Sequence, residues 1–161
     1  MNKKAFTLLE VLVYLAILVL LLTIALIAFE NVKARTRNTK RVTDINQIQK
    51  ALELYFNTQG GYPEGTDLEL GTENTQALCS GPSASGFQSS NTICGDNPVV
   101  YIDRVPKAFG LDSDCKAGGS DRYLYTKISA NDYNLTFCLG RKIDDLDPGS
   151  CIAKPGKLTC Q

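Results

Sequence analysis

The sequence predicts an α+β fold in which one long N-terminal helix packs on a small antiparallel β-sheet with disulfide-tied loops. Three observations support this prediction. Residues 6–59 contain neither Gly nor Pro, residues 123–139 are rich in aromatic and β-branched side chains, and six cysteines are spread through a Gly- and Ser-rich C-terminal region. A chain of 161 residues has room for one compact domain beside such a helix.

The long helix changes character midway. Residues 6–30 are apolar all round, and Val11 to Phe29 carry no charge, which suits lipid or another apolar surrounding. Residues 31–59 carry one apolar stripe that steps by three and four, formed by Val42, Ile45, Ile48, Leu52, Tyr55 and Phe56. We expect this stripe to pack on the sheet. The side facing water then holds Asp44, Asn46, Gln47, Gln49, Lys50 and Glu53.

The apolar half has the length of a membrane span. Residues 11–29 give about 28 Å of helix, close to the ~30 Å hydrocarbon core of a bilayer. A cleaved secretory signal is disfavoured, because the apolar run is too long and no small-x-small site closes it. The basic start and the cysteine-rich region predict an N-in, C-out orientation, although the basic run at 33–41 opposes it. That run is interpreted as a solvated helix face, or as a contact with lipid headgroups or a neighbour's acidic patch.

The composition argues against an enzyme and against a nucleic-acid-binding protein. The chain has no His, so the usual general base at neutral pH and the commonest metal ligand are both missing. The formal net charge is zero, which gives no reason to expect nucleic acid as a partner.

Beyond the helix, the sequence predicts loops and a hairpin. The segment Gly60-Gly61-Tyr62-Pro63 ends the helix, since Gly suits a left-handed cap and Pro prevents continuation. Residues 64–98, 107–122 and most of the tail after 139 are expected to be loops, with a short strand at 99–103. Residues 123–128 and 133–139 predict a hairpin. Its second strand turns one apolar face toward the helical stripe, formed by Tyr133, Leu135, Phe137 and Leu139.

All six cysteines lie beyond the predicted helix: Cys79, Cys94, Cys115, Cys138, Cys151 and Cys160. No pair has C-x-x-C spacing, so disulfides are favoured over zinc, and disulfides imply an oxidising compartment. Six cysteines allow 15 pairings, among which sequence alone cannot decide. The preferred set joins Cys79 to Cys94, Cys138 to Cys151 and, by elimination, Cys115 to Cys160.

The N-terminal string Lys3-Lys4-Ala5-Phe6-Thr7-Leu8-Leu9-Glu10 resembles the processing site of type IV pilins and type II secretion pseudopilins. In that family a basic leader is cut before Phe on the cytoplasmic side, the new amine is methylated, and a glutamate stands fifth in the mature chain. The resemblance places the cut between Ala5 and Phe6, with Ala5 where Gly is commoner, and the methyl group on Phe6. Glu10 is then the mature chain's fifth residue, able to pair with a neighbour's terminal amine and set the assembly register.

The resemblance implies a structural subunit, not an enzyme, with four parts. These are a leader at 1–5, a transmembrane and assembly half of the helix at 6–30, an amphipathic half at 31–59, and a β-rich head at 60–161. The expected partners are other copies or related pilins, prepilin peptidase, the inner-membrane assembly platform and, before assembly, membrane lipid. The expected place is the cytoplasmic membrane as a precursor, then a cell-surface or periplasmic filament.

Two further hypotheses stay open on sequence. The chain could instead be a single-pass, membrane-anchored extracellular binding domain that does not polymerise. No cofactor is expected, except that Asp112, Asp114 and Asp121 could form an oxygen cage for calcium, which favours 6–8 oxygen ligands from loops.

Overall fold

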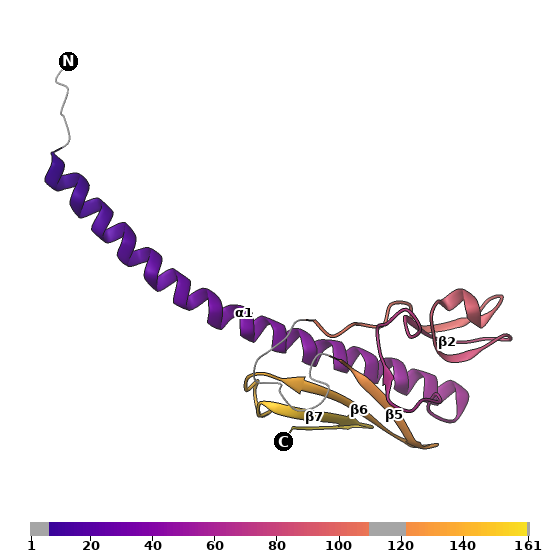
Figure 1. The fold of residues 1–161 in the computed structure, drawn as a ribbon. Helices are drawn as coiled ribbons and strands as arrows, with labels where there is room; N and C mark the ends of the chain where they lie inside the picture. The colour runs from indigo at the N-terminus through magenta and orange to yellow at the C-terminus, as the bar shows by residue number, and fades with distance from the viewer. Residues whose placement is uncertain (1–6, 110–121, 161) are drawn as a thin grey trace.

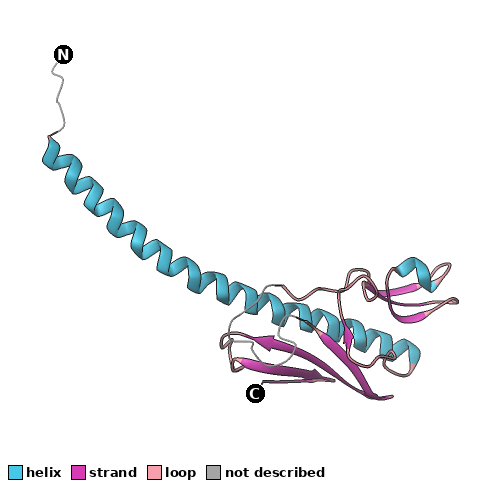
Figure 2. Ribbon diagram, viewed as in Figure 1, coloured by secondary structure: helices cyan, strands magenta, loops and turns pink. Residues whose placement is uncertain are grey.

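The computed structural model describes residues 7–109 and 122–160, except for the side chains of residues 25 and 27–31. Within these residues the chain forms one long helix, a short 3-10 helix and eight strands (Figure 1). The strands all lie against the second half of the helix, and the first half projects away from them (Figure 2). The predicted α+β architecture is therefore confirmed, with a helical stem and a β-rich head.

The helix α1 spans Leu8–Gln59 and ends at the residue that the sequence predicts. Thr7 caps its N-terminus, and its side chain accepts a hydrogen bond from the Glu10 amide. Gly60 closes the C-terminus in a left-handed conformation (φ 73°), and its amide donates to the Phe56 carbonyl at 2.8 Å. A residue with a Cβ is strained at this φ, which explains why the chain has glycine here.

The larger sheet has the strand order β1-β5-β6-β7-β8, and all its neighbouring strands are antiparallel. Its strands are β1 (Leu68–Glu69), β5 (Leu124–Ser129), β6 (Asp132–Leu139), β7 (Gly149–Lys154) and β8 (Lys157–Cys160). The hairpin of β5 and β6 matches the prediction within one residue at each end. The tail, predicted as mostly loop, instead forms the β7–β8 hairpin, so that prediction was wrong.

The core lies between the helical stripe and this sheet. Ile45, Ile48 and Leu52 are at most 1% exposed and belong to one buried cluster with the apolar face of β6. That face contributes Tyr133, Leu135, Phe137 and Leu139, as predicted. Burying a large apolar side chain contributes about 1.5–3 kcal/mol, so the stripe and the strand face together hold the head on the helix.

A second, smaller sheet has the order β3-β2-β4 and lies at the far end of the helix (Figure 1). It consists of β2 (Ala77–Ser80), β3 (Ser85–Gln88) and β4 (Val99–Ile102), with the 3-10 helix η1 (Asn91–Cys94) between β3 and β4. The loop predicted over residues 64–98 therefore contains β1, β2, β3 and η1. All four residues of β2 are buried, which is why this short strand does not alternate between apolar and polar residues.

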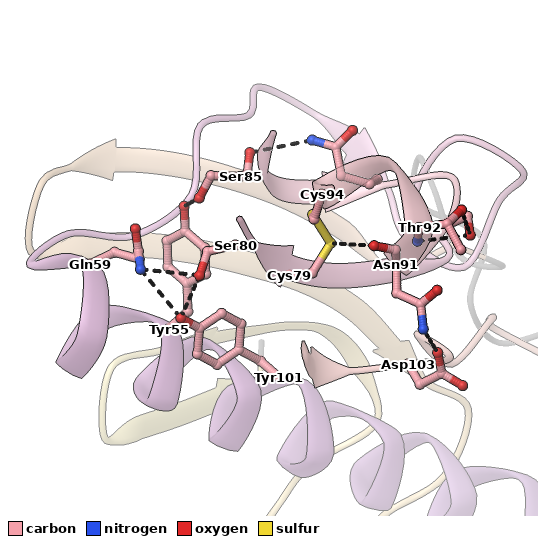
Figure 3. Close-up of a disulfide and its surroundings, with 12 residues drawn as sticks. Tyr55, Gln59, Cys79, Ser80, Ser85, Asn91, Thr92, Cys94, Tyr101 and Asp103 are labelled. Atoms are coloured by element: carbon pink, nitrogen blue, oxygen red, sulfur yellow. Dashed lines mark hydrogen bonds between the residues drawn. A yellow bond between two sulfur atoms is a disulfide. The ribbon is translucent and has the colours of Figure 1, made fainter. Parts of the chain in front are cut away.

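Disulfides fasten both sheets. Cys79 of β2 is bonded to Cys94 of η1, as predicted (Figure 3). Gly81 makes the close approach of these segments possible, because a Cβ at this position would lie 2.0 Å from the Cys94 carbonyl oxygen.

The other two predicted pairings were wrong. Cys151 is bonded to Cys160, since the two face each other across the β7–β8 hairpin with their Cα atoms 4.0 Å apart. This bond leaves neither the predicted Cys138–Cys151 disulfide nor the predicted Cys115–Cys160 disulfide possible. Cys138, whose register partner in β7 is Ser150, is also disulfide-bonded. Cys115 lies outside the described residues.

Candidate functional site

The first turn of α1 holds the glutamate that the sequence singles out. Glu10 is partly exposed and stands in the turn that Thr7 caps. The positive end of the helix dipole favours a carboxylate there, typically by 0.3–1 kcal/mol. Ala5 and Phe6, the predicted cleavage and methylation residues, lie outside the described residues. The structure therefore shows Glu10 in a supported position and leaves its partner as a prediction.

Among the residues that the structure describes, none covers the apolar half of α1. Large apolar side chains from Leu8 to Ile24 are all at least 46% exposed, and Leu8 reaches 83%. Such a continuous apolar surface marks a place where another apolar body packs. Within the described residues, no helix is both long and apolar enough to cross a membrane.

A buried polar network joins the helix to the head just beyond this half. Arg41 is 2% exposed, and its guanidinium donates to the Asn38 side-chain oxygen at 3.2 Å and to the carbonyls of Cys138 and Phe109, each at 3.4 Å. The Asn38 oxygen also accepts from the Gly140 amide at 3.1 Å. These bonds fix the end of β6 against the helix, because a buried donor or acceptor left unmade costs about 1–3 kcal/mol.

Asp44 extends this network one turn further along the helix. Its carboxylate accepts a hydrogen bond from the Tyr123 hydroxyl at 3.1 Å and forms an ion pair with Lys40 at 2.8 Å. Asp44 is 7% exposed, so its placement on the water-facing side was wrong. The reason is that Asp44 and Arg41 have buried partners in the head, which outweigh the cost of leaving water.

The spacing of these residues could have revealed the network. Asn38, Arg41 and Ile45 follow one another at steps of three and four, so the buried stripe continues toward the N-terminus through polar residues. The basic run is correspondingly split. Arg41 faces the head, whereas Lys33 and Arg35 are exposed, as a solvated helix face requires.

At the far end of the helix, hydroxyl groups join α1 to the small sheet (Figure 3). The Tyr101 hydroxyl of β4 is hydrogen-bonded to the Thr58 hydroxyl and, at 2.9 Å, to the Ser80 hydroxyl of β2. Burial raises the pKa of Tyr101, but its hydrogen bonds with Ser80, Thr58 and Gln59 outweigh burial, and the pKa is lowered. The cluster fixes the small sheet to the end of the helix, and it was not predicted from the sequence.

The described residues hold no group of three or more acids, Cys or His placed to bind a metal ion. The predicted calcium ligands Asp112, Asp114 and Asp121 lie outside them. The calcium hypothesis therefore stays a prediction.

Residues 1–26 match a family model described as the prokaryotic N-terminal methylation motif. The chain thus carries the prepilin-type signal of type IV pilins and pseudopilins, which indicates a structural protein whose precursor is processed by prepilin peptidase. The matched stretch covers the capped first turn with Glu10 and most of the exposed apolar surface. No curated protein and no solved structure matches the chain.

Proposed function

We propose that this chain is a structural subunit, a pilin or pseudopilin, of a type IV pilus-like or type II secretion filament. The observation that carries the proposal is the uncovered apolar half of α1, which begins with the matched methylation motif. A side chain such as Leu12, 61% exposed, is stabilised by about 1.5–3 kcal/mol when it is buried. A surface of this extent is therefore stabilised by packing against another apolar surface, and copies of the same helix supply a matching one.

Processing prepares the helix for assembly. Cleavage between Ala5 and Phe6 gives a new terminal amine, which is positive, four residues before the negative Glu10. Inside an apolar filament core an unpaired charge costs several kcal/mol, so each Glu10 is satisfied only where a neighbour's amine lies against it. Apolar packing alone does not distinguish one axial position from another, whereas this pairing does.

Before assembly, the precursor is held in the cytoplasmic membrane through its apolar half, with the N-terminus inside and the head outside. Lipid covers the apolar surface as well as a neighbouring helix does, so the gain on leaving the membrane comes from close packing and polar pairing. The partners are then prepilin peptidase, the inner-membrane assembly platform, and other copies or related pilins. The disulfides of the head agree with an oxidising compartment.

Substitution of Glu10 tests the proposal. Glu10→Val in the full chain, expressed with its assembly machinery, is expected to be cleaved normally, which mass spectrometry of the N-terminal peptide measures. Filaments counted by electron microscopy are expected to fall at least tenfold, because the register contact is lost. Glu73→Val, at an exposed acid of the head, is the matched control and should assemble normally. Normal filaments from Glu10→Val would show that the register argument is wrong.

A further inference from the structure

Charge is segregated along this molecule. Residues 31–43 contain five basic side chains and no acid, and residues 51–103 contain seven acids and neither Lys nor Arg. The seven acids are Glu53, Glu64, Asp67, Glu69, Glu73, Asp96 and Asp103. The segregation follows the long axis, because the first segment lies where α1 enters the head and the second forms the end of α1 and the small sheet (Figure 1).

The basic end presents side chains to its surroundings. We call the exposed positions Lys33 and Arg35 the basic neck. The helix face around them is also exposed, including Val32, Thr36 and Thr39. Lys40 is a weaker contributor, because it pairs with Asp44 at 2.8 Å. The neck therefore offers two cations on an uncovered helix surface directly after the apolar half.

The opposite end presents acids. We call Glu53, Glu64, Asp67 and Asp132 the acidic tip, which surrounds the turn after the helix. The Tyr62 amide in this turn donates to Ala130 between β5 and β6, and Lys127 of β5 pairs with Glu64. Burial raises the pKa of Tyr62, and the charges of Glu53 and Asp132 raise it further, which is consistent with both carboxylates lying near the Tyr62 side chain. The four acids outnumber Lys50, Lys127 and Lys157, the bases beside them, although the ion pair with Lys127 makes Glu64 a weaker contributor.

The spacing of neck and tip fixes how two copies can meet. Glu53 follows Lys33 by 20 residues and Arg35 by 18, which is about 27–30 Å along the helix at ~1.5 Å per residue. Two parallel copies at equal height would place neck beside neck and tip beside tip, where like charges repel. A copy displaced along the axis by this distance would place its tip beside its neighbour's neck, where opposite charges attract.

From this arrangement we infer that the basic neck is a docking surface for the acidic tip of a second copy of this chain, displaced along the filament axis by about 27–30 Å. The inference rests on the proposed filament function and deepens it. Neck and tip add a second register contact, at the level of the heads, to the one that Glu10 makes in the core. Since all of these charged side chains except the half-buried Asp132 are exposed, the contact weakens as salt rises.

Charge reversal in the full chain, expressed with its assembly machinery, tests the inference. The double variant Lys33→Glu/Arg35→Glu is expected to lower the number of filaments seen by electron microscopy at least tenfold, and so is Glu53→Lys/Glu64→Lys. The chain that carries all four substitutions has an acidic neck and a basic tip, and should recover at least half of the wild-type number. The matched control is Arg122→Glu/Lys142→Glu, which reverses two exposed bases of the head outside both neck and tip and should assemble as wild type.

The outcomes separate this inference from the proposed function. If wild type forms filaments and the neck variant forms as many, the docking inference is overturned and the filament function stands. If the neck variant accumulates as uncleaved precursor, the basic neck acts on the membrane and not on a second copy. If the fourfold variant recovers nothing while its thermal unfolding matches that of wild type, the pairing of neck and tip is refuted. If wild type forms no filaments, the proposed function itself has failed.

Discussion

The buried tyrosines make the stability of the head sensitive to alkaline pH. Tyr123, Tyr125 and Tyr133 are at most 1% exposed, and burial raises the pKa of each hydroxyl above its ordinary value of 10.0. Above pH 10 the unfolded chain loses these protons and the folded chain keeps them. The stability is therefore complete below pH 10 and is lost as pH rises from 10 toward the folded-state pKa values.

The size of this effect follows from proton linkage. Each of the three groups lowers the free energy of unfolding by about 1.4 kcal/mol per pH unit in that window, which gives about 4 kcal/mol per unit together. A domain with a typical stability of about 5–10 kcal/mol then unfolds between about pH 11 and 13. Tyr125→Phe should lower the dependence to about 3 kcal/mol per unit. Tyr101→Phe is the control and should not change it, because the pKa of Tyr101 is lowered and not raised.

The assay follows tyrosinate absorbance near 295 nm and far-ultraviolet circular dichroism together, with the full chain in detergent. Tyr14→Phe is used as the background, since Tyr14 lies in the apolar half that the detergent covers. The buried hydroxyls should ionise only as the dichroism of the sheet is lost. Ionisation of all remaining tyrosines in one step near pH 10, with dichroism intact, would refute the reasoning.

Two other predictions concern the joints of the head. Arg41→Met should lower the free energy of unfolding in urea by about 2–4 kcal/mol, since it removes buried hydrogen bonds from a charged donor. The control Arg35→Met should change it by no more than about 0.5 kcal/mol. Equal effects of the two substitutions would contradict the assigned network. Cys79→Ser/Cys94→Ser should cost about 3 kcal/mol in the same measurement, as expected for a bond that closes a loop of 15 residues, and an unchanged midpoint would contradict that role.

The elements that the sequence predicted well are those whose signals are local. The helix ends at Gln59 because Gly60 adopts the left-handed cap, and this requirement is visible in four consecutive residues. The β5–β6 hairpin has aromatic and β-branched strands around a short turn. Cys79 and Cys94 are 15 residues apart and enclose only the strand β3 and the start of η1, so their bond was the easiest of the three to predict.

The errors occurred where partners are distant in sequence. The strand β2 is recognisable only through its pairing with β3 and β4. Arg41 and Asp44 are charged, and their burial depends on carbonyls and a hydroxyl supplied about 70–100 residues later. The β7–β8 hairpin did have a local signal, the turn Pro155-Gly156 between two short segments that each hold apolar residues, and that signal would have placed Cys151 opposite Cys160.

The identity of the mature N-terminus within assembled filaments shows whether this chain is a processed filament subunit. Filaments sheared from cells and digested would be analysed by mass spectrometry for their first peptide. We expect a chain that begins at Phe6 with a methylated amine, and we expect this form to be the one found in filaments. An intact Met1, or a start near residue 29, would show that the chain is not processed as a filament subunit. The chain would then be a membrane-anchored or secreted domain and not a filament subunit.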